Sequence, residues 1–467
     1  MPNAFHIENF GCRAARADGE AIAERLRASG HSLRQPSEAD VVIVNTCSVT
    51  AEADREARAY VRRAHRLNPE ARIVVTGCYA QRAPEELAGL PGVAAVIGNS
   101  HKALAPEIVT RLAAGDPQPA LHQSFVPIRN VADTSGALAP IWADDHFAHS
   151  FLEEAQLAPG AQTRPNLKIQ EGCGNRCTFC VIPQTRGNSR SLPEDKVLTQ
   201  VRGFVDAGGN ELVLSGINLG RWGRDLPPHP SESRHSLAEM VRRIFAETDL
   251  PRLRLSSIEP MDWDAQLISL LREFGGVRLA RHAHLPLQSG SDSVLRRMHR
   301  RYRPWHYSEK VLALRQAAGP GLTLGADVMV GFPGETDGEF QETADFIRSH
   351  PFGYLHLFPF SPRPGTPGWD LHRRTPVPAA VVEQRMAALR LLGSEKSRAH
   401  RSSFVGGPLE CITLHTPEAL RMKNLTTALS DNFLPVELEG SLAANSFVTV
   451  QVTGLSAAGA VVGIIQV

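Results

Sequence analysis

Apolar and polar positions form a repeating strand-and-helix pattern over the first part of the chain. The apolar runs HIENFGC, VVIVNTC, RIVVTGC and VAAVIG are short and rich in β-branched residues, and predicted helices at 21–29 and 52–66 separate them. Buried parallel strands read as continuous apolar runs, and helices between them supply the crossover connections. The pattern predicts a small α/β domain with a parallel sheet, which we place at residues 1–115.

The periodicity then fades and returns. Residues 116–165 are rich in Pro, Gly, Ala and His, which is typical of a linker. Over residues 166–400 the runs LKIQ, ELVLSGIN, RLRLSSIEP, LARHAHLPLQ, LTLGADVMVGFP and YLHLFPFS alternate with helical segments. Repeated βα units predict a full or partial parallel barrel. Within it, Thr336 and Glu339 have the spacing of a capping box that begins a helix.

The last segment, residues 401–467, has a different pattern. ECITLH, FLPVELE, SFVTVQV and AVVGIIQV are short strand-like runs divided by Gly, Asn and Ser. Closely spaced short strands with polar turns are typical of a small antiparallel barrel. The predicted fold class is therefore α/β, with an N-terminal parallel-sheet domain, a central βα barrel and a C-terminal β-barrel.

Length, composition and charge narrow the class of protein. The 467 residues are 42% hydrophobic and 21% charged, as in globular proteins of several domains. The 50 basic and 49 acidic residues nearly cancel, so any affinity for nucleic acid has to come from local basic patches. The sequence begins without the apolar run of a signal peptide, and no run is long enough to span a bilayer. We therefore expect a cytoplasmic protein with no membrane partner.

Three cysteines lie close together directly after the run LKIQ. Cys173, Cys177 and Cys180 have the spacing C-x-x-x-C-x-x-C in GCGNRCTFC. Thiolates ligate iron, and three of them leave one iron of a 4Fe–4S cube open to a cofactor or substrate. The alternative is a structural zinc site, which needs a fourth ligand, with His282 and His284 as distant candidates.

Three further cysteines each end an apolar run: Cys12, Cys47 and Cys78. Because the carboxyl ends of parallel strands meet at one edge of a sheet, these residues are predicted to converge there. They could hold a second cluster with its own open iron. Taken singly, each is equally well explained as a small buried apolar residue. Cys411 has no such company, and we expect it to be structural.

The motifs together resemble those of the radical S-adenosylmethionine (SAM) methylthiotransferases. The resemblance covers nearly the whole chain and rests on NTCSVT, TGCYAQ, KIQEGCGNRCTFC, IPQTRGNSRS, HLPLQSGSDSVLRRM, VGFPGET and FPFSPRPGT. It implies an N-terminal cluster domain, a radical SAM barrel and a C-terminal TRAM domain. It also implies two 4Fe–4S clusters, SAM as both methyl donor and radical source, and an electron donor such as a flavodoxin or ferredoxin. The cluster on Cys12, Cys47 and Cys78 would carry the transferred sulfur.

Three subfamilies of these enzymes differ in substrate. NTCSVT, KIQEGC and RGNSRS are most similar to the MtaB-type group, which implies methylthiolation of carbon 2 of threonylcarbamoyladenosine at position 37, in the anticodon stem-loop of tRNA. The alternatives are isopentenyladenosine in tRNA and an aspartate of a ribosomal protein. An alternative of another class is a non-catalytic, zinc-stabilised RNA-binding protein. DNA is not an expected partner.

One segment departs from the family pattern. The family usually carries Asn and Glu shortly after the first cysteine, whereas GCRAARADGE supplies Ala, Arg and Asp. The departure puts the role of those flanking side chains in question, although Cys12 itself is present. No acid–base residue is assigned, because removal of hydrogen from an aromatic carbon by a radical needs none.

The resemblance also implies a set of SAM-binding residues. A glycine-bearing segment and polar groups at strand ends are expected to meet the amino group, ribose and adenine of SAM: Gly208, Gly209, Asn218, Ser257, Glu259, His284 and Gln288. The glycine pair is equally explained as a turn that ends a helix. The polar residues are equally explained as helix caps.

Arginine clusters on three segments are the candidate contacts to RNA phosphates, which arginine binds in a bidentate manner. They are Arg62, Arg63, Arg186, Arg190, Arg296, Arg297 and Arg300. A solvated charged surface is the alternative. The C-terminal barrel is expected to add contacts to RNA through Arg421 and Lys423, near a loop whose bases can be splayed out.

Overall fold

The structure is a computed structural model that describes residues 4–114, 138–147, 150, 163–228 and 234–466. Most of the predicted linker, residues 116–165, lies outside the described residues. The described part of it forms a short strand, β6 (Ile141–Trp142), which pairs in parallel with the edge of the N-terminal sheet. That strand was not predicted, because two residues carry no periodicity.

The N-terminal region is a six-stranded sheet in which every neighbouring pair is parallel, in the order β2-β1-β3-β4-β5-β6. The strands other than β6 are β1 (Ala4–Asn9), β2 (Ser32–Leu33), β3 (Val41–Thr46), β4 (Arg72–Gly77) and β5 (Val93–Gly98). The helices are α1 (Arg13–Ala28), α2 (Ala51–Leu67), α3 (Cys78–Arg82), α4 (Pro84–Ala88) and α5 (Ala105–Ala113).

Strand periodicity places the core of this sheet on both faces. Val42 and Val44 of β3 pack toward α2, whereas Val41 and Ile43 pack toward α1 and α5. The predicted parallel-sheet domain is confirmed.

Helix α1 begins at Arg13, eight residues before the predicted start at residue 21. Asp18 and Gly19 weakened the helical pattern, but both are buried within the helix. A Cβ on Gly19 would lie 1.7 Å from Asn9 Oδ1, so close packing against β1 requires glycine there.

The central region is a partial parallel barrel. One ladder runs β10-β9-β7-β8 and a second runs β11-β12-β13, and a parallel bridge between Leu253 and Leu279 lies between them. Its strands are β7 (Asn166–Glu171), β8 (Arg190–Ser191), β9 (Glu211–Gly216), β10 (Arg252–Leu255), β11 (His282–His284), β12 (Thr323–Val330) and β13 (Phe352–Pro359). One continuous core fills it, and the predicted barrel is confirmed in its partial form.

Nine helices are described around this barrel. They are α6 (Ile182–Arg186), α7 (Glu194–Asp206), α8 (Leu237–Glu247), α9 (Ala265–Phe274), α10 (Asp292–Arg297), α11 (Pro304–Ala318), α12 (Asp337–Ser349), α13 (Pro367–Arg374) and α14 (Ala379–Ser402). The predicted capping box begins α12: Thr336 accepts from the Glu339 amide, and Glu339 accepts from the Thr336 amide.

The C-terminal region is a closed five-stranded barrel in the order β14-β15-β16-β18-β17. Its elements are β14 (Pro408–Thr413), α15 (Glu418–Arg421), β15 (Leu425–Ser430), β16 (Pro435–Glu439), β17 (Phe447–Leu455) and β18 (Val461–Ile465). Strand β15 was missed, and β16 pairs with β18 in parallel, whereas the other pairs are antiparallel as predicted. Cys411 is fully buried in this barrel.

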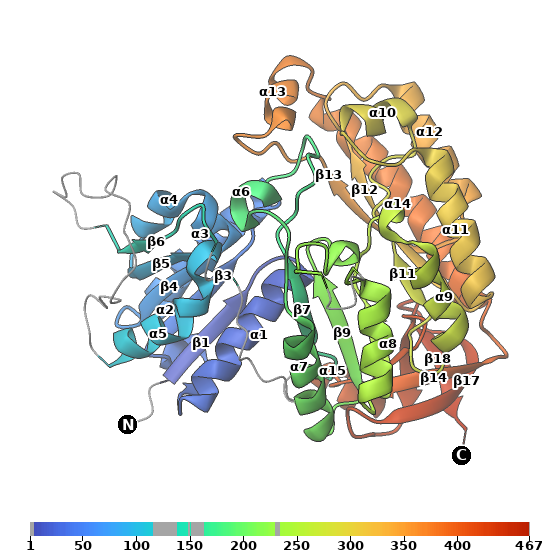
Figure 1. Cartoon of the computed structure of the whole chain (residues 1–467), viewed down its shortest axis with the longest axis horizontal. Helices are drawn as coiled ribbons and strands as arrows, with labels where there is room; N and C mark the ends of the chain where they lie inside the picture. The colour runs from blue at the N-terminus through green and yellow to red at the C-terminus, as the bar shows by residue number, and fades with distance from the viewer. Residues whose placement is uncertain (1–3, 115–137, 148–149, 151–162, 229–233, 467) are drawn as a thin grey trace.

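The three regions pack against one another. Helix α1 lies against β7, and the C-terminal barrel lies beneath the central barrel in the view of Figure 1. Arg281 pairs with Asp431 at 2.6 Å, and Asn432 donates to the Gly321 carbonyl at 3.0 Å, which fixes the C-terminal barrel to the central one. Among the helices described, none is both long and apolar enough to cross a membrane.

Candidate cluster and cofactor sites

Cys12, Cys47 and Cys78 lie at one edge of the N-terminal sheet. They follow β1, β3 and β4, which are adjacent parallel strands, so the carboxyl ends of the strands bring them together. Burial, together with the nearby Cys12 and Cys78, raises the pKa of Cys47 to about 12. Gly11 has φ +100°, and a Cβ there would lie 2.6 Å from Cys47 Sγ, so glycine is what allows Cys12 to approach Cys47.

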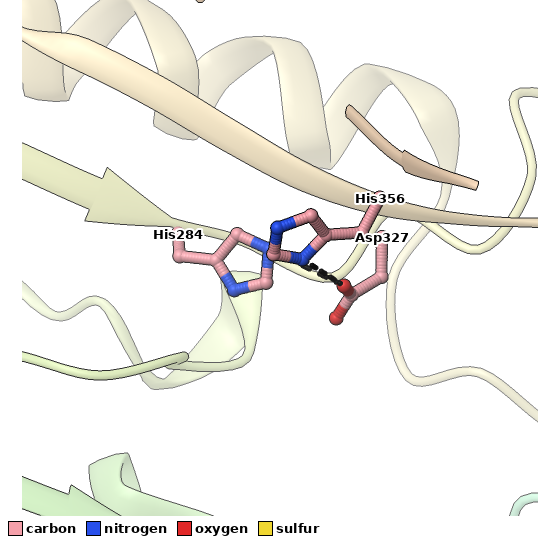
Figure 2. Close-up of side chains that lie close together, drawn as sticks. All are labelled: His284, Asp327 and His356. Carbon is pink, nitrogen blue, oxygen red and sulfur yellow. Dashed lines mark hydrogen bonds and ion pairs between the residues drawn. The ribbon is translucent and has the colours of Figure 1, made fainter. Parts of the chain in front are cut away.

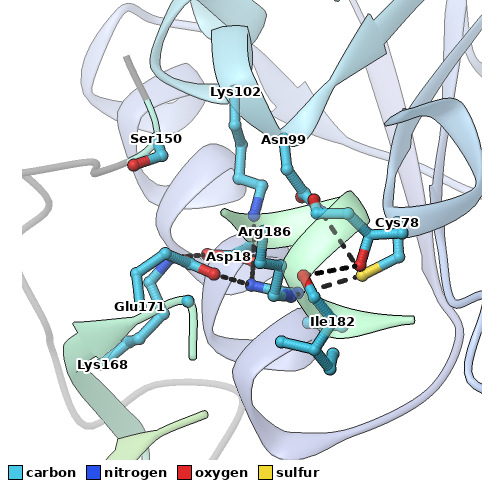
Figure 3. Close-up of polar contacts among 12 residues, drawn as sticks. Asp18, Cys78, Asn99, Lys102, Ser150, Lys168, Glu171, Ile182 and Arg186 are labelled. Carbon is cyan, nitrogen blue, oxygen red and sulfur yellow. Dashed lines mark hydrogen bonds and ion pairs between the residues drawn. The ribbon is translucent and has the colours of Figure 1, made fainter. Parts of the chain in front are cut away.

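Two side chains donate hydrogen bonds to the Cys78 sulfur, as Figure 3 shows. Asn99 Nδ2 and Arg186 Nε each lie 3.3 Å from Cys78 Sγ. Asn99 also donates to the Thr185 carbonyl at 2.8 Å, so α6 of the central region takes part in building the N-terminal site. Arg186 Nη2 is buried without a hydrogen-bond partner among the described residues.

Arg186 belongs to a buried group of five charged side chains: Asp18, Lys102, Lys168, Glu171 and Arg186. Arg186 lies 3.2 Å from Asp18 and 2.5 Å from Glu171, and both lysines contact Asp18. Burial lowers the pKa of Lys102 to about 8, against the opposing attraction of Asp18. Three cations face two carboxylates, and buried charge needs compensation, which cluster-ligating thiolates would provide.

This arrangement corrects the prediction for Arg186 and shows what Asp18 does in the segment after Cys12. Arg186 was predicted to contact an RNA phosphate, but it is fully buried between Cys78, Asp18 and Glu171 and has no access to a polyanion. Asp18, part of the segment that departs from the family pattern, supplies a buried carboxylate to the same ion-pair group.

Cys173, Cys177 and Cys180 follow β7 and form a second set of three thiols. Burial, together with the neighbouring Cys177 and Cys173, raises the pKa of Cys180 to about 12. Cys173 Sγ accepts from the Asn175 amide at 3.4 Å and from Asn218 Nδ2 at 3.7 Å. Asn218, at the carboxyl end of β9, is thereby placed at this site.

Arg300 donates a hydrogen bond to a cysteine sulfur at this site, as Arg186 does at the other site. Its Nη1 donates to Cys177 Sγ at 3.2 Å, its Nε lies 3.2 Å from the Tyr302 hydroxyl, and its Nη2 contacts Glu259. Arg300 was also predicted to contact RNA, and its burial in these contacts corrects that prediction. Glu259 is placed beside the cysteines.

The spacing of the sulfurs tests which group the cysteines fit. Among the described residues, neither set of three cysteines has its sulfurs all within 4.8 Å of one another, whereas His284, Asp327 and His356 meet that limit. Bonds of about 2.3 Å in a tetrahedral zinc site place the sulfurs about 3.8 Å apart. Each cysteine of a four-iron cluster binds a different iron, so its sulfurs need not converge on one metal ion as they do at a zinc site. All six thiols are free.

Gly208 and Gly209 do not lie at this site, which corrects the prediction that they contact SAM. Both precede β9, at the opposite end of the strand from Asn218. Their amides bond to the Val205 and Phe204 carbonyls, and Gly208 has φ +82°, so the pair ends helix α7. Gly208 also accepts a hydrogen bond from Asn445 of the C-terminal barrel.

The remaining predicted SAM-binding residues gather around β11. Ser257 Oγ bonds to His284 Nδ1, and Gln288 has φ 62° with its Oε1 buried and unpaired among the described groups. A strained non-glycine residue of this kind is common at functional sites. His282 bonds to the Tyr354 hydroxyl at 2.8 Å.

Two residues that the sequence analysis missed, Asp327 and His356, complete a triad with His284 (Figure 2). Asp327 Oδ1 lies 3.4 Å from His284 Nε2 and 3.3 Å from His356 Nδ1. Burial alone would raise the pKa of Asp327, but hydrogen bonds to the two histidines hold it well below its usual range. The signal was an aspartate inside the apolar run LTLGADVMVGFP.

The other predicted RNA-contacting arginines differ in exposure. Arg62, Arg63 and Arg296 are exposed, on α2 and α10. Arg190 donates to Ser150 Oγ at 2.9 Å, and Arg297 pairs with Glu339 at 2.7 Å, so both are partly engaged within the fold.

A cavity of about 330 Å³ opens beside the first cysteine site. Its lining comes from all three regions of the chain: Gly11, Cys12, Arg13, Arg16, Arg164, Asn166, Val213 and Phe433. The volume is within the range of small-molecule sites.

Comparisons with known proteins agree with this architecture. Residues 4–98 match the uncharacterized protein family UPF0004, and residues 167–347 match the radical SAM superfamily. A solved structure of TsrM, a radical SAM methyltransferase from Kitasatospora setae, aligns with a TM-score of 0.52 and 15% identity over 80% of this chain and 78% of TsrM. That likeness concerns the fold alone.

Full-length relatives identify the family. The threonylcarbamoyladenosine tRNA methylthiotransferase MtaB of Bacillus subtilis is 34% identical over 94% of this chain and 90% of its own, and that of Rickettsia prowazekii is 32% identical over 96% and 94%. The tRNA-2-methylthio-N(6)-dimethylallyladenosine synthase of Cereibacter sphaeroides is 33% identical over 86% and 85%. The chain therefore belongs to the radical SAM methylthiotransferases, transferases that use S-adenosylmethionine and a 4Fe–4S cluster.

Proposed function

We propose that this chain adds a methylthio group to carbon 2 of N6-threonylcarbamoyladenosine at position 37 of tRNA. In this proposal Cys173, Cys177 and Cys180 hold the cluster at which SAM is cleaved, and Cys12, Cys47 and Cys78 hold a second 4Fe–4S cluster. Relatives that carry this activity in their names span more than nine-tenths of the chain. The isopentenyladenosine alternative has support from a relative of similar identity.

The observation that carries the proposal is the pair of three-thiol sites joined through Arg186. This residue contacts Cys78 of one site and Glu171, which lies two residues before Cys173 of the other. One side chain thereby fixes the position of the first site relative to the strand that leads into the second. A reaction that uses two clusters on one substrate requires such rigid placement.

The bound cluster and SAM supply a radical able to remove hydrogen from an aromatic carbon, and the protein's side chains position these groups. The positively charged Arg300 donates a hydrogen bond to Cys177 Sγ, and its other terminal nitrogen contacts Glu259. Asn218 donates to Cys173 and is the candidate contact to SAM at this site. Ser257, His284 and Gln288 are the further candidates for binding the ribose and adenine of SAM.

The proposal includes tRNA contacts and an external electron donor such as a flavodoxin or ferredoxin. Exposed Arg62, Arg63 and Arg296 are the candidate phosphate contacts, with Arg421 and Lys423 on the exposed α15 side of the C-terminal barrel. We place the domain boundaries near residues 115, 165 and 400, by the sequence patterns.

Nucleoside mass spectrometry of tRNA tests the substrate. A strain lacking the gene should lose 2-methylthio-N6-threonylcarbamoyladenosine and accumulate the unmethylthiolated nucleoside. The wild-type gene should restore the product, and Cys173→Ala should not. Loss of the isopentenyl product instead, or unchanged tRNA with loss of methylthio-aspartate, would contradict the proposal.

Iron analysis tests the second cluster. Protein purified without oxygen should hold about eight irons per chain, and Cys12→Ala combined with Cys47→Ala should leave about four. Cys411→Ala is the matched control, because that thiol is buried in the C-terminal barrel and should leave the iron content unchanged. A wild-type content of four that the double variant does not change would rule out the second cluster.

A further inference from the structure

The cavity beside Cys12 has an unusual concentration of arginine in its wall. Arg13 and Arg16 come from the first turns of α1, and Arg164 comes from the segment before β7. Segments about 150 residues apart in the sequence thus direct positive charge into one space. Arginine stays protonated in proteins, so the wall carries this charge at any ordinary pH.

Acidic side chains do not neutralise Arg13 and Arg16, and Arg164 shares the Glu211 carboxylate with two other arginines. Within the described part of the chain, neither Arg13 nor Arg16 forms an ion pair with a carboxylate. Asp327 attracts Arg13 only at longer range and is already bonded to two histidines. Arg164 lies 3.4 Å from Glu211, but that carboxylate also serves Arg252 and Arg254.

Burial makes the lack of counter-charge significant. Desolvation lowers the pKa of both Arg13 and Arg164, although Glu211 opposes the shift at Arg164. Arg164 Nε is buried and has no hydrogen-bond partner among the described groups. A cavity with uncompensated guanidinium groups is suited to an anionic ligand.

An aromatic side chain also lines the cavity, next to Arg13. Phe433 reaches in from the loop between β15 and β16, and the Arg13 guanidinium lies 5.6 Å from the centre of its ring. Its φ of 67° is uncommon for a bulky residue, and His282 stacks on it at 4.4 Å. The Arg254 guanidinium also lies over this ring, 5.4 Å from its centre, so Phe433 helps to hold Arg13 beside the cavity.

We propose that this cavity binds the carboxylate of the threonylcarbamoyl group of the substrate nucleoside, through Arg13 and Arg16 with support from Arg164. The inference rests on the function proposed above and deepens it. The threonyl group ends in a carboxylate, whereas the dimethylallyl group is a hydrocarbon with nothing to offer a guanidinium. Because Cys12 also lines the cavity, a nucleoside held here lies beside the site of Cys12, Cys47 and Cys78.

A phosphate of the tRNA backbone is the other anion that could enter this cavity. The two sources differ in one testable respect: the backbone is the same in every RNA of one sequence, whereas the carboxylate belongs to the modified base. Probes that change only the base therefore separate them.

Fluorescence anisotropy with the full-length protein provides the test. Three anticodon stem-loops of one sequence carry at position 37 threonylcarbamoyladenosine, its carboxamide analogue, or adenosine. Wild-type protein should bind the carboxylate form about tenfold more tightly than the carboxamide, as expected for a charge-assisted hydrogen bond. This comparison needs no variant, so it does not depend on how a variant folds.

The variants Arg13→Ala and Arg16→Ala should abolish this preference and change the binding of the adenosine form by less than about twofold. Arg34→Ala is the control of equal charge, because exposed Arg34 follows β2 at the opposite edge of the sheet and bonds to Phe5 at the start of β1. It should retain the full preference.

Two results would overturn the inference: equal binding of the carboxylate and carboxamide forms by wild-type protein, or an equal loss with all three RNAs in the Arg13 variant, which would indicate a phosphate. Either result leaves the proposed function standing if the deletion strain still loses the threonylcarbamoyl product. Conversely, a deletion strain that loses a different nucleoside refutes the function even where the carboxylate preference is observed.

Discussion

Each cysteine site contains one buried arginine that contacts both a sulfur and a carboxylate. Arg186 joins Cys78 to Asp18 and Glu171, and Arg300 joins Cys177 to Glu259. Such an arginine is held by its carboxylates and cannot reorganise when the charge on the sulfur changes. Rigid positive charge near a cluster is a means by which a protein tunes cluster potential.

The buried ion-pair group predicts an asymmetry between its members. Glu171→Gln leaves three cations facing Asp18 alone, and we expect it to lower the free energy of unfolding by about 3–5 kcal/mol. Arg186→Met leaves two cations and two carboxylates, so its cost should be smaller in protein without clusters. Urea denaturation of the unloaded protein measures both.

Glu24→Gln is the control, because Glu24 forms an exposed pair with Arg27 at 3.2 Å that is worth less than about 1 kcal/mol. Equal losses for the Glu171 and Arg186 variants would show that charge balance does not govern this group.

At the scale of elements, helix α14 covers the last strands of the central barrel and leads into the C-terminal barrel. His400 near its end bonds to Thr323 Oγ1 at 2.8 Å and packs on Gly353, where an added Cβ would lie 2.7 Å from the imidazole. The side chain thus connects α14 to the starts of β12 and β13. Burial lowers the pKa of His400 to about 4, and nearby Arg401 and Arg315 add to the shift.

This shift predicts a pH-dependent stability. The folded-state pKa of about 4 lies below the ordinary value of 6.5, so the unfolded chain binds the proton more readily. The stabilisation is complete above about pH 6.5 and is lost as the pH falls toward 4, by at most roughly 3 kcal/mol. His400→Gln should flatten the dependence of unfolding free energy on pH across that window.

Denaturation at several pH values measures the effect, with His415→Gln at an exposed position of the C-terminal barrel as the control. An unchanged slope in the His400 variant would assign the pH dependence to other groups.

At the scale of the whole molecule, the C-terminal barrel closes one end of the central barrel. Asp431 is buried and accepts from Arg281 at 2.6 and 3.2 Å, Arg254 donates to the Ser430 carbonyl at 3.0 Å, and Phe433 follows in the same loop. One short loop therefore docks this barrel and also completes the arginine-lined cavity.

Loss of the Asp431–Arg281 ion pair should weaken the packing of the C-terminal barrel on the central barrel. Asp431→Ala removes the acceptor of two charge-assisted hydrogen bonds, and we expect a cost of roughly 2–3 kcal/mol. Hydrogen exchange should become faster at Asn432 and in β11, while β3 and β4 of the N-terminal sheet stay protected. Glu418→Ala on the exposed helix α15 is the control, and equal exchange in the two variants would count against the docking role.

The sequence by itself determined most of the strands and helices, the capping box of α12 and the two sets of cysteines, whereas the strands β6 and β15 were missed. These features depend on neighbours within a few residues: alternation along a strand, the spacing of a cap, or a cysteine that ends an apolar run. The family assignment followed from the same local motifs.

Only the tertiary structure decided where the charged and polar side chains lie. Arg186 and Arg300 lie in arginine-rich segments that look like exposed basic surfaces. In the structure both are buried, and Asp18, which contacts Arg186, is 168 residues away in the sequence. Gly208 and Gly209 end α7 and precede β9, so they lie at the opposite end of that strand from Asn218. Asp327 had one local signal, an aspartate inside an apolar run, whereas His356 and Phe433 had none. Whether a charged side chain is buried or exposed depends on which distant segments pack around it. The local pattern of apolar and polar residues does not contain that information.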